Sequence, residues 1–319
     1  MKYKNFFTLI LGVMVALLVV SCQQEDELPF DTNDQTDGQD GLGGQDGDDG
    51  QGGQTDFGNG LVGRFTVSGT QLSLIQSGPA SSGFYNETRQ QEFWKFYTDL
   101  IPSDLWPFIK ELTLFADEQD GTAAYMGPLS DNNLSRWEMG WNLSFVWDEN
   151  QEFIKGETAY TAIHEYAHGL TLHAGQVNVN TAGCSSFSTW EGCTNPDSYL
   201  NLFFQRFWTA IIEEHRRIGE DDFDALDNFH RKYRDQFVTA YAATNPAEDI
   251  AETFAVFVTQ DIPTGNSIAD QKVQFLYDFN ELVVIRQRIR DNIDFNINLS
   301  AIGKARTQRA RPKHDHKHF

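Results

Sequence analysis

The sequence predicts an α+β fold, in which a small mixed sheet and one apolar helix precede a mainly helical second half. Residues 135–147 alternate between large apolar and mostly small or polar side chains, the period of a strand with one buried face. Residues 157–174 and four later segments instead carry apolar side chains at spacings of three and four, as helices do. Strand signals therefore gather before residue 150 and helix signals after it.

The elements before residue 150 follow from local patterns. Residues 85–100 are predicted to form an amphipathic helix. Short strands are expected at 111–118 and 122–128, on either side of a turn at 119–121. The strand at 135–147 completes this half of the fold.

The helix at 157–174 begins the second half, and Gly175 is a natural stop for it. A loop rich in Gly, Asn, Ser and Cys then extends to Pro196. The remaining helices are expected at 197–217, 222–240, 246–260 and 267–292.

The N-terminal segment has the pattern of a secretory signal. Lysines at the start precede an uncharged apolar run to Val20, which is too short to span a membrane comfortably. Ser21 and Cys22 follow, and this junction resembles the lipobox of bacterial lipoproteins, whose cysteine carries lipid after cleavage. We therefore expect residues 1–21 to be a signal peptide and Cys22 to be lipidated. The resemblance implies a bacterial outer-membrane lipoprotein that faces the cell surface or the periplasm.

The regions that flank the predicted domain are polar. Residues 22–60 consist mainly of Asp, Gly, Gln and Thr, cannot bury enough apolar surface to fold, and are expected to form a flexible tether. The folded domain is expected at 61–303, followed by a flexible basic tail at 304–319. Because the chain has a formal net charge of −22 in spite of that tail, nucleic acid is not an expected partner.

Two cysteines remain besides Cys22. Cys184 and Cys193 have eight residues between them, in the loop that is rich in small polar residues. In an oxidising compartment this spacing favours a local disulfide. A zinc-binding pair is the alternative, but no CxxC spacing supports it.

The stretch TAIHEYAHGL, residues 161–170, places two histidines one helical turn apart. On one helix face, His164 and His168 can present two imidazole nitrogens to a single ion. Glu165 is rotated by about 100° from His164, so its carboxylate lies beside the ion without ligating it. Zinc polarises water, and such a carboxylate can accept the proton as the water attacks a carbonyl.

The alternative is that these histidines are packed or solvated side chains without a ligand. Tyr160, Ile163 and Ala167 make the helix largely apolar. Polar residues in such a helix cost free energy unless something pairs with them, so we favour the metal site.

Histidines are poor candidates for the third ligand. In the extended motif H-E-x-x-H-x-x-G-x-x-H, the glycine and the third histidine would fall on Thr171 and Ala174, which excludes that class. His173 is one residue out of place. His215 and His230 lie in charged segments and are expected to be solvated.

Two glutamates are better candidates. Asn245 and Pro246 form a good helix start, and Glu248 and Glu252 lie four apart on one face of the helix that follows. Two carboxylates that face another helix need a cation or hydrogen-bond donors. The alternatives are a capping box between Asn245 and Glu248, and a solvated charge or ion pair at Glu252.

The segment Y-x-x-T-N-x-A-E-x-x-A-E-x-F, after an HExxH helix, resembles the gluzincin metallopeptidases and in detail the lethal-factor-like zinc peptidases. The chain as a whole resembles zinc metallopeptidase lipoproteins of bacterial cell surfaces. The resemblance implies a zincin-like fold and one zinc ion. It also implies roles for six residues: His164, His168 and Glu248 as ligands, Glu165 as general base, Glu252 as the carboxylate that orients His164, and Tyr241 as the hydroxyl that binds the oxyanion.

The sequence thus predicts a zinc metallopeptidase that acts on protein or peptide substrates and is held at a membrane by its lipid. The strand at 135–147 is expected to bind peptide along its edge, with a purely structural role as the alternative. A zinc-dependent amidase acting on cell-wall or other non-protein substrates and a non-catalytic binding lipoprotein are the rival functions. We also expect a monomer.

Overall fold

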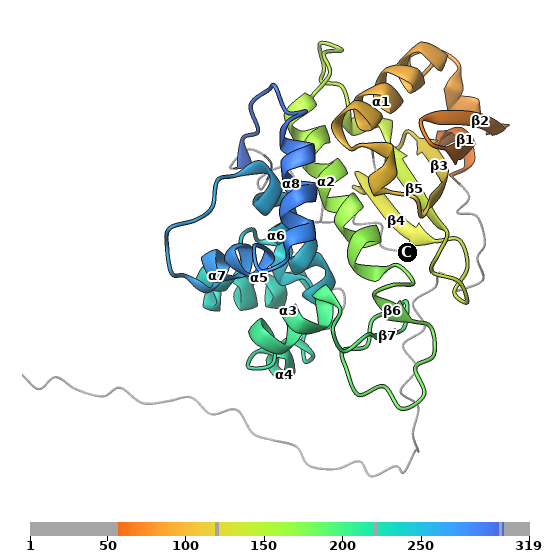
Figure 1. The fold of residues 1–319 in the computed structure, drawn as a ribbon. Coiled ribbons are helices and arrows are strands. Elements are labelled where there is room, and N and C mark those ends of the chain that lie inside the picture. The colour runs from red at the N-terminus through yellow and green to blue at the C-terminus, as the bar shows by residue number, and fades with distance from the viewer. Residues whose placement is uncertain (1–56, 119–120, 220–221, 300–301, 303–319) are drawn as a thin grey trace, which may run out of the picture. The chain divides into compact units, whose positions relative to one another are not determined.

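The structure is a computed structural model, which describes residues 57–118, 121–219, 222–299 and 302. It confirms the α+β fold, with a five-stranded sheet and helices that mostly follow it in the chain (Figure 1). The predicted signal peptide, the lipidation of Cys22, nearly all of the tether and the basic tail at 304–319 lie outside the described residues. None of the described helices is both long enough and apolar enough to cross a membrane.

The sheet is mixed, as predicted, and has the strand order β2-β1-β3-β5-β4. Only the pair β3–β5 is parallel, and the other neighbours are antiparallel. The strands are β1 (Leu61–Ser68), β2 (Gln71–Ser77), β3 (Ile109–Phe115), β4 (Ala124–Pro128) and β5 (Trp137–Asn142). The first two strands were not predicted from the sequence, and β3 and β4 correspond to the strands expected at 111–118 and 122–128.

The prediction of one long strand at 135–147 is wrong in two respects. Strand β5 ends at Asn142, whose side chain accepts a hydrogen bond from the backbone N–H of Ser144 at 3.1 Å and so begins a 3-10 turn. In addition, β5 lies between β3 and β4 and has no free edge. The proposed binding of peptide along this strand is therefore excluded.

Helix α1 (Glu87–Leu100) confirms the amphipathic helix expected at 85–100, and the Asn86 side chain caps its first turn. Helix α2 (Lys155–Leu172) lies at the predicted place and is buried along most of its length. Gly169 allows α2 to approach the ring of Phe108, because a Cβ atom at this position would lie only 2.2 Å from the ring. Helix α2 is thereby held against the segment that leads into β3.

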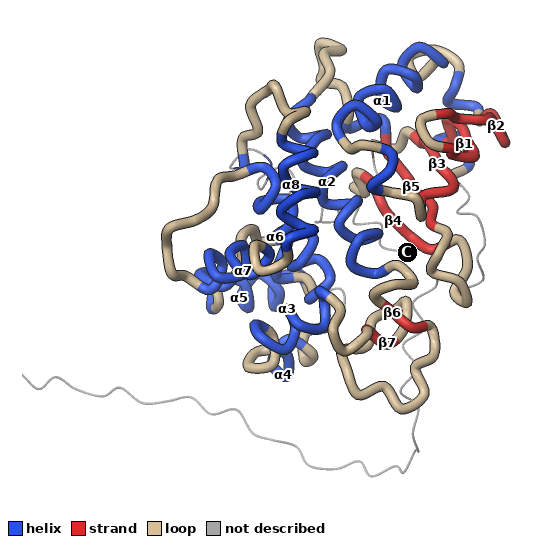
Figure 2. The backbone as a smooth tube through the Cα atoms, viewed as in Figure 1, coloured by secondary structure: helices blue, strands red, loops and turns tan. Residues whose placement is uncertain are grey.

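The second half is helical, as predicted (Figure 2). The helix expected at 246–260 is found within one residue, whereas the regions expected as helices at 197–217, 222–240 and 267–292 contain shorter helices. The apolar spacing at 197–217 and 267–292 continues through turns, because apolar residues on both sides of each turn contact the same core. The helices are α3 (Tyr199–Phe207), α4 (Ile212–His215), α5 (Phe223–Lys232), α6 (Pro246–Thr259), α7 (Ile268–Leu276) and α8 (Asn280–Arg290). Helix α2 packs against α6, and this contact forms the candidate site.

Candidate metal centre

Three predicted ligands converge where α2 faces α6. The Nε2 atom of His164 lies 3.1 Å from Oε2 of Glu248, and Nε2 of His168 lies 3.4 Å from the same oxygen. The two Nε2 atoms are 3.1 Å apart. Both histidines are buried and Glu248 is partly buried. The three residues form a group that could hold a metal ion.

The distances are longer than those of a charged hydrogen bond and close to those between ligands of one metal ion. Tetrahedral ligands at bond lengths of about 2.0–2.1 Å are about 3.3–3.4 Å from one another. Hydrogen bonds between a charged imidazole and a carboxylate are shorter, about 2.7–2.9 Å. Moreover, Oε2 of Glu248 is buried and accepts no well-formed hydrogen bond from the described residues. A cation would satisfy this oxygen and both imidazole nitrogens at once.

The charges in the site favour a cation beside Glu248. Burial lowers the pKa of His168, but Glu248 beside it outweighs burial, so that the pKa rises to about 9. Burial raises the pKa of Glu248, but His168 and His164 outweigh it and hold that pKa well below its usual value. The carboxylate is therefore ionised at neutral pH and attracts a positive charge to this point, which a proton on His168 or a metal ion can supply.

Glu252 orients the first histidine. Its Oε1 atom lies 2.7 Å from Nδ1 of His164, so a proton on Nδ1 would face this carboxylate and leave Nε2 directed toward Glu248. The other oxygen, Oε2, accepts hydrogen bonds from Thr239 Oγ1 at 2.6 Å and from the Tyr160 hydroxyl at 3.1 Å. The carboxylate is fully buried, so the alternative of a solvated charge at Glu252 is wrong.

Replacing Glu252 with Gln is expected to weaken metal affinity by about 10–100-fold, because the amide binds the imidazole N–H less strongly and leaves His164 less well oriented. The Thr239→Val variant removes one of the two donors that hold Glu252 and should have a smaller effect in the same direction. Competition with a chromogenic chelator measures both affinities. Equal affinity in the wild type and in Glu252→Gln would show that Glu252 does not support the ligand.

The start of α6 places Glu248. Asn245 Oδ1 accepts hydrogen bonds from the backbone N–H groups of Ala247 and Glu248, each at 2.9 Å, and Pro246 occupies the first turn. The predicted helix start is confirmed. The capping-box alternative for Glu248 is wrong, because its carboxylate turns to the two histidines.

Glu165 and Tyr241 border the same pocket as the three ligands. Glu165 follows His164 on α2 and is 5% exposed. Tyr241 lies in a short 3-10 turn before α6, with its ring centroid 5.9 Å from that of His164. All six residues predicted for the site are therefore close together.

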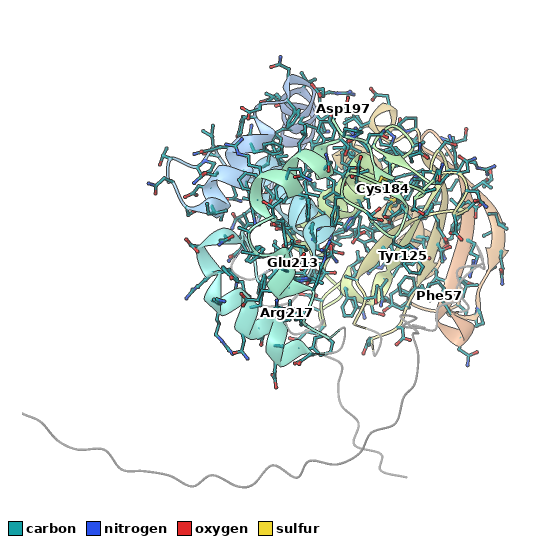
Figure 3. The ribbon with its side chains drawn as sticks, turned by 90° about the horizontal axis from the view of Figure 1, so that it is seen from below. Phe57, Tyr125, Cys184, Asp197, Glu213 and Arg217 are labelled. Atoms are coloured by element: carbon teal, nitrogen blue, oxygen red, sulfur yellow. A yellow bond between two sulfur atoms is a disulfide. The ribbon has the colours of Figure 1, made fainter. Side chains whose placement is uncertain are left out.

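The pocket has a volume of about 490 Å³. Its walls come from α2, the segment 241–248, strand β4 and a turn in the loop after α2. Strand β4 runs beside α2 and has no described strand on its outer side (Figure 1). The free sheet edge at the site therefore belongs to β4, which carries Tyr125 (Figure 3).

The loop after α2 contains the predicted disulfide between Cys184 and Cys193, with a Cα–Cα distance of 5.6 Å. The bond confirms the prediction and excludes the zinc-binding pair. The short strands β6 (Val177–Asn178) and β7 (Cys193–Thr194) pair within this loop.

Neither His215 nor His230 belongs to the metal group found among the described residues, and both are partly buried rather than fully solvated as expected. Nε2 of His215 lies 3.2 Å from the carbonyl oxygen of Ala243, and its ring packs on Trp208. Burial lowers the pKa of both histidines. The sequence around each histidine is charged, but the histidine itself lies on the side of its helix that contacts aromatic residues.

The sequence did not point to Thr239, Tyr160 or the pocket walls. Tyr160 precedes His164 by one helical turn on the same face, and this spacing could have identified it as a partner of Glu252. Thr239 offers no such signal, because it reaches Glu252 from an irregular segment.

No family model matches the chain, and comparisons with curated proteins and with solved structures also find no match. The assignment of a function therefore depends on the geometry of the site.

Proposed function

We propose that the protein is a zinc metallopeptidase of the gluzincin type, with a zincin-like fold and one zinc ion held by His164, His168 and Glu248. The observation that carries the proposal is the triangle of their ligand atoms, with sides of 3.1, 3.1 and 3.4 Å. The buried Glu252 behind His164 adds the outer carboxylate that metal-binding histidines usually have.

Two imidazoles and one carboxylate favour zinc over magnesium or calcium, which take oxygen ligands. Structural zinc sites are closed by four protein ligands, whereas catalytic sites have three and leave one position open. Within the described residues, three ligands converge beside a pocket. This arrangement supports a catalytic role and counts against the non-catalytic binding protein.

A zinc ion held there would polarise a water molecule and the carbonyl of a substrate. The protein's own groups then carry out the proton transfers. The Glu165 carboxylate accepts a proton from the attacking water and passes it to the leaving amine. The Tyr241 hydroxyl donates a hydrogen bond to the oxygen that becomes negative.

The open edge of β4 offers backbone donors and acceptors to an extended peptide beside the ligands. We therefore propose that the edge of β4 binds the peptide, in place of the edge of the strand expected at 135–147. The edge of β4 favours a peptide over the non-protein substrate of an amidase. The proposal also includes a membrane anchor through Cys22, an outer-membrane location and a monomeric state. These three parts are inferred from the sequence alone.

Peptides that carry N-methyl groups test the role of β4. Scanning an N-methyl group along a cleaved peptide should lower kcat/KM by about tenfold at one or more positions near the cut bond, because a hydrogen bond to β4 is lost. Methylation at positions distant from the cut bond serves as the control. A uniform response along the peptide would exclude pairing with β4.

The proposed function is tested by incubating the zinc-loaded full chain with unfolded casein and identifying fragments by mass spectrometry. We expect cleavage that stops on removal of zinc with a chelator and returns when zinc, but not magnesium, is added. Cleavage that survives complete metal removal would contradict the proposal. If casein stays intact while amide bonds of cell-wall peptides are cut, the amidase is the correct function.

A further inference from the structure

A tight turn, Thr189–Gly192, forms one wall of the pocket. Thr189 donates its backbone N–H to the carbonyl of Gly192 at 2.8 Å, and a β-bridge joins Ser188 to Cys193 just outside the turn. Gly192 has a φ of +147°, and a Cβ atom there would lie 2.2 Å from the carbonyl oxygen of Asn178. Glycine is therefore required at this position of the turn.

The turn is held in place from three sides. The disulfide between Cys184 and Cys193 closes the loop at its base. The ring of Phe187 stacks on Phe204 of α3, with centroids 4.3 Å apart. The Asn201 side chain accepts the backbone N–H of Phe187 at 3.1 Å. The tip of the turn is therefore presented to the pocket by a rigid base.

Two adjacent side chains, Trp190 and Glu191, lie at the tip of the turn. Trp190 is 85% exposed and Glu191 is partly buried, and both line the pocket that contains the metal group. In the parts of the chain that the structure describes, Glu191 forms no salt bridge and the Trp190 indole forms no hydrogen bond. An unpartnered Trp on a rigid turn is unusual at a surface and is typical of a contact residue.

Three carboxylates line the pocket. Glu165, Glu191 and Glu248 line it, whereas no described Lys or Arg does. In the proposed site, the metal ion binds Glu248 and both histidines. Glu191 is not part of the metal group, although its negative charge acts on His168. Its carboxylate can therefore pair with a cation of the substrate.

We propose that Trp190 and Glu191 select peptides with a Lys or Arg side chain next to the cut bond, on the side that faces the turn. The cation stacks on the indole and its donors reach the Glu191 carboxylate. This inference rests on the proposed peptidase function, for which it names the substrate class.

Binding to the inert Glu165→Gln variant of the zinc-loaded full chain tests the inference without catalysis. The probes are otherwise identical peptides that carry Lys, Gln or Glu at one position. The varied position is moved along the peptide from one set of probes to the next. We expect Lys to bind about tenfold more tightly than Gln at one position, the effect of one charge-assisted hydrogen bond. Adding Glu191→Gln should remove this preference, and adding Trp190→Ala should weaken it about threefold.

Asp197→Asn is the matched control, because it removes a charge from an exposed residue of the same region that does not line the pocket (Figure 3). It should retain the preference for Lys. Unchanged zinc content and circular dichroism would show that each variant is folded.

Cleavage sites in casein provide the second readout. Wild-type sites should have Lys or Arg at one fixed position, and Glu191→Lys should shift this position toward Asp and Glu. If the wild type cleaves but Glu191→Lys has the same site profile, the inference is wrong and the peptidase function stands. If the wild type cleaves nothing, the peptidase function fails. In that case the binding experiment alone tests the inference. Equal binding of the Lys, Gln and Glu peptides would overturn the inference.

Discussion

Replacing Glu165 with Gln is expected to lower kcat/KM for peptide cleavage by about 10³-fold without loss of the metal ion. Gln has nearly the same shape as Glu but cannot accept a proton from the attacking water. Glu165 lies in the pocket beside the ligands and is not one of them. Cleavage of a fluorogenic peptide and metal content, measured on the same samples, separate the loss of chemistry from the loss of metal.

Glu149→Gln is a matched control, because Glu149 is exposed and does not line the pocket. It should retain full activity. If Glu165→Gln holds zinc and cleaves at the same rate as Glu149→Gln, the general base is another group.

Replacing Lys272 with Met is expected to destabilise the protein by about 3–5 kcal/mol. Lys272 on α7 donates to Asp249 on α6 at 2.6 Å, and both side chains are fully buried. Trp208 also donates to Asp249, at 2.7 Å. Burial raises the pKa of Asp249 to about 6 and lowers that of Lys272, which shows that either charge alone is unfavourable in this place. Removal of the lysine leaves a buried carboxylate without its cation.

Asp249 directly follows the ligand Glu248, so the pair also fixes α6 where it faces α2. Unfolding in urea measures the loss of stability. Lys95→Met is the control, because the Lys95–Asp99 pair is largely exposed and should contribute less than about 1 kcal/mol. Equal effects of the two substitutions would show that the buried pair does not stabilise the fold.

The candidate ligands could be predicted from the sequence because their signals are local. His164 and His168 share one helical face, and Glu248 and Glu252 share another. Asn245 and Pro246 mark the start of the second helix within a few residues of Glu248. The resemblance to gluzincins joined these two local patterns, and the structure places them opposite each other.

The strand order and the pocket walls could not be predicted, because they depend on contacts between distant residues. The alternation that begins at Trp137 continues to Trp147, although the side chain of Asn142 ends the strand before that point. Strand β4, not β5, lies at the edge because β5 pairs with both β3 and β4. The spacing of apolar residues within one strand does not predict such pairing. The turn with Trp190 has no periodic signal and reaches the pocket only through the fold of its loop.

The central claim is that His164, His168 and Glu248 bind one zinc ion, and metal content tests it most directly. The full chain and its variants are equilibrated with zinc, dialysed, and measured by mass spectrometry of the elements. We predict one zinc ion per chain in the wild type and in Glu165→Gln, and none in His168→Ala or Glu248→Ala. A folded wild type that retains no zinc, or a Glu248→Ala variant that retains as much as the wild type, would contradict the claim.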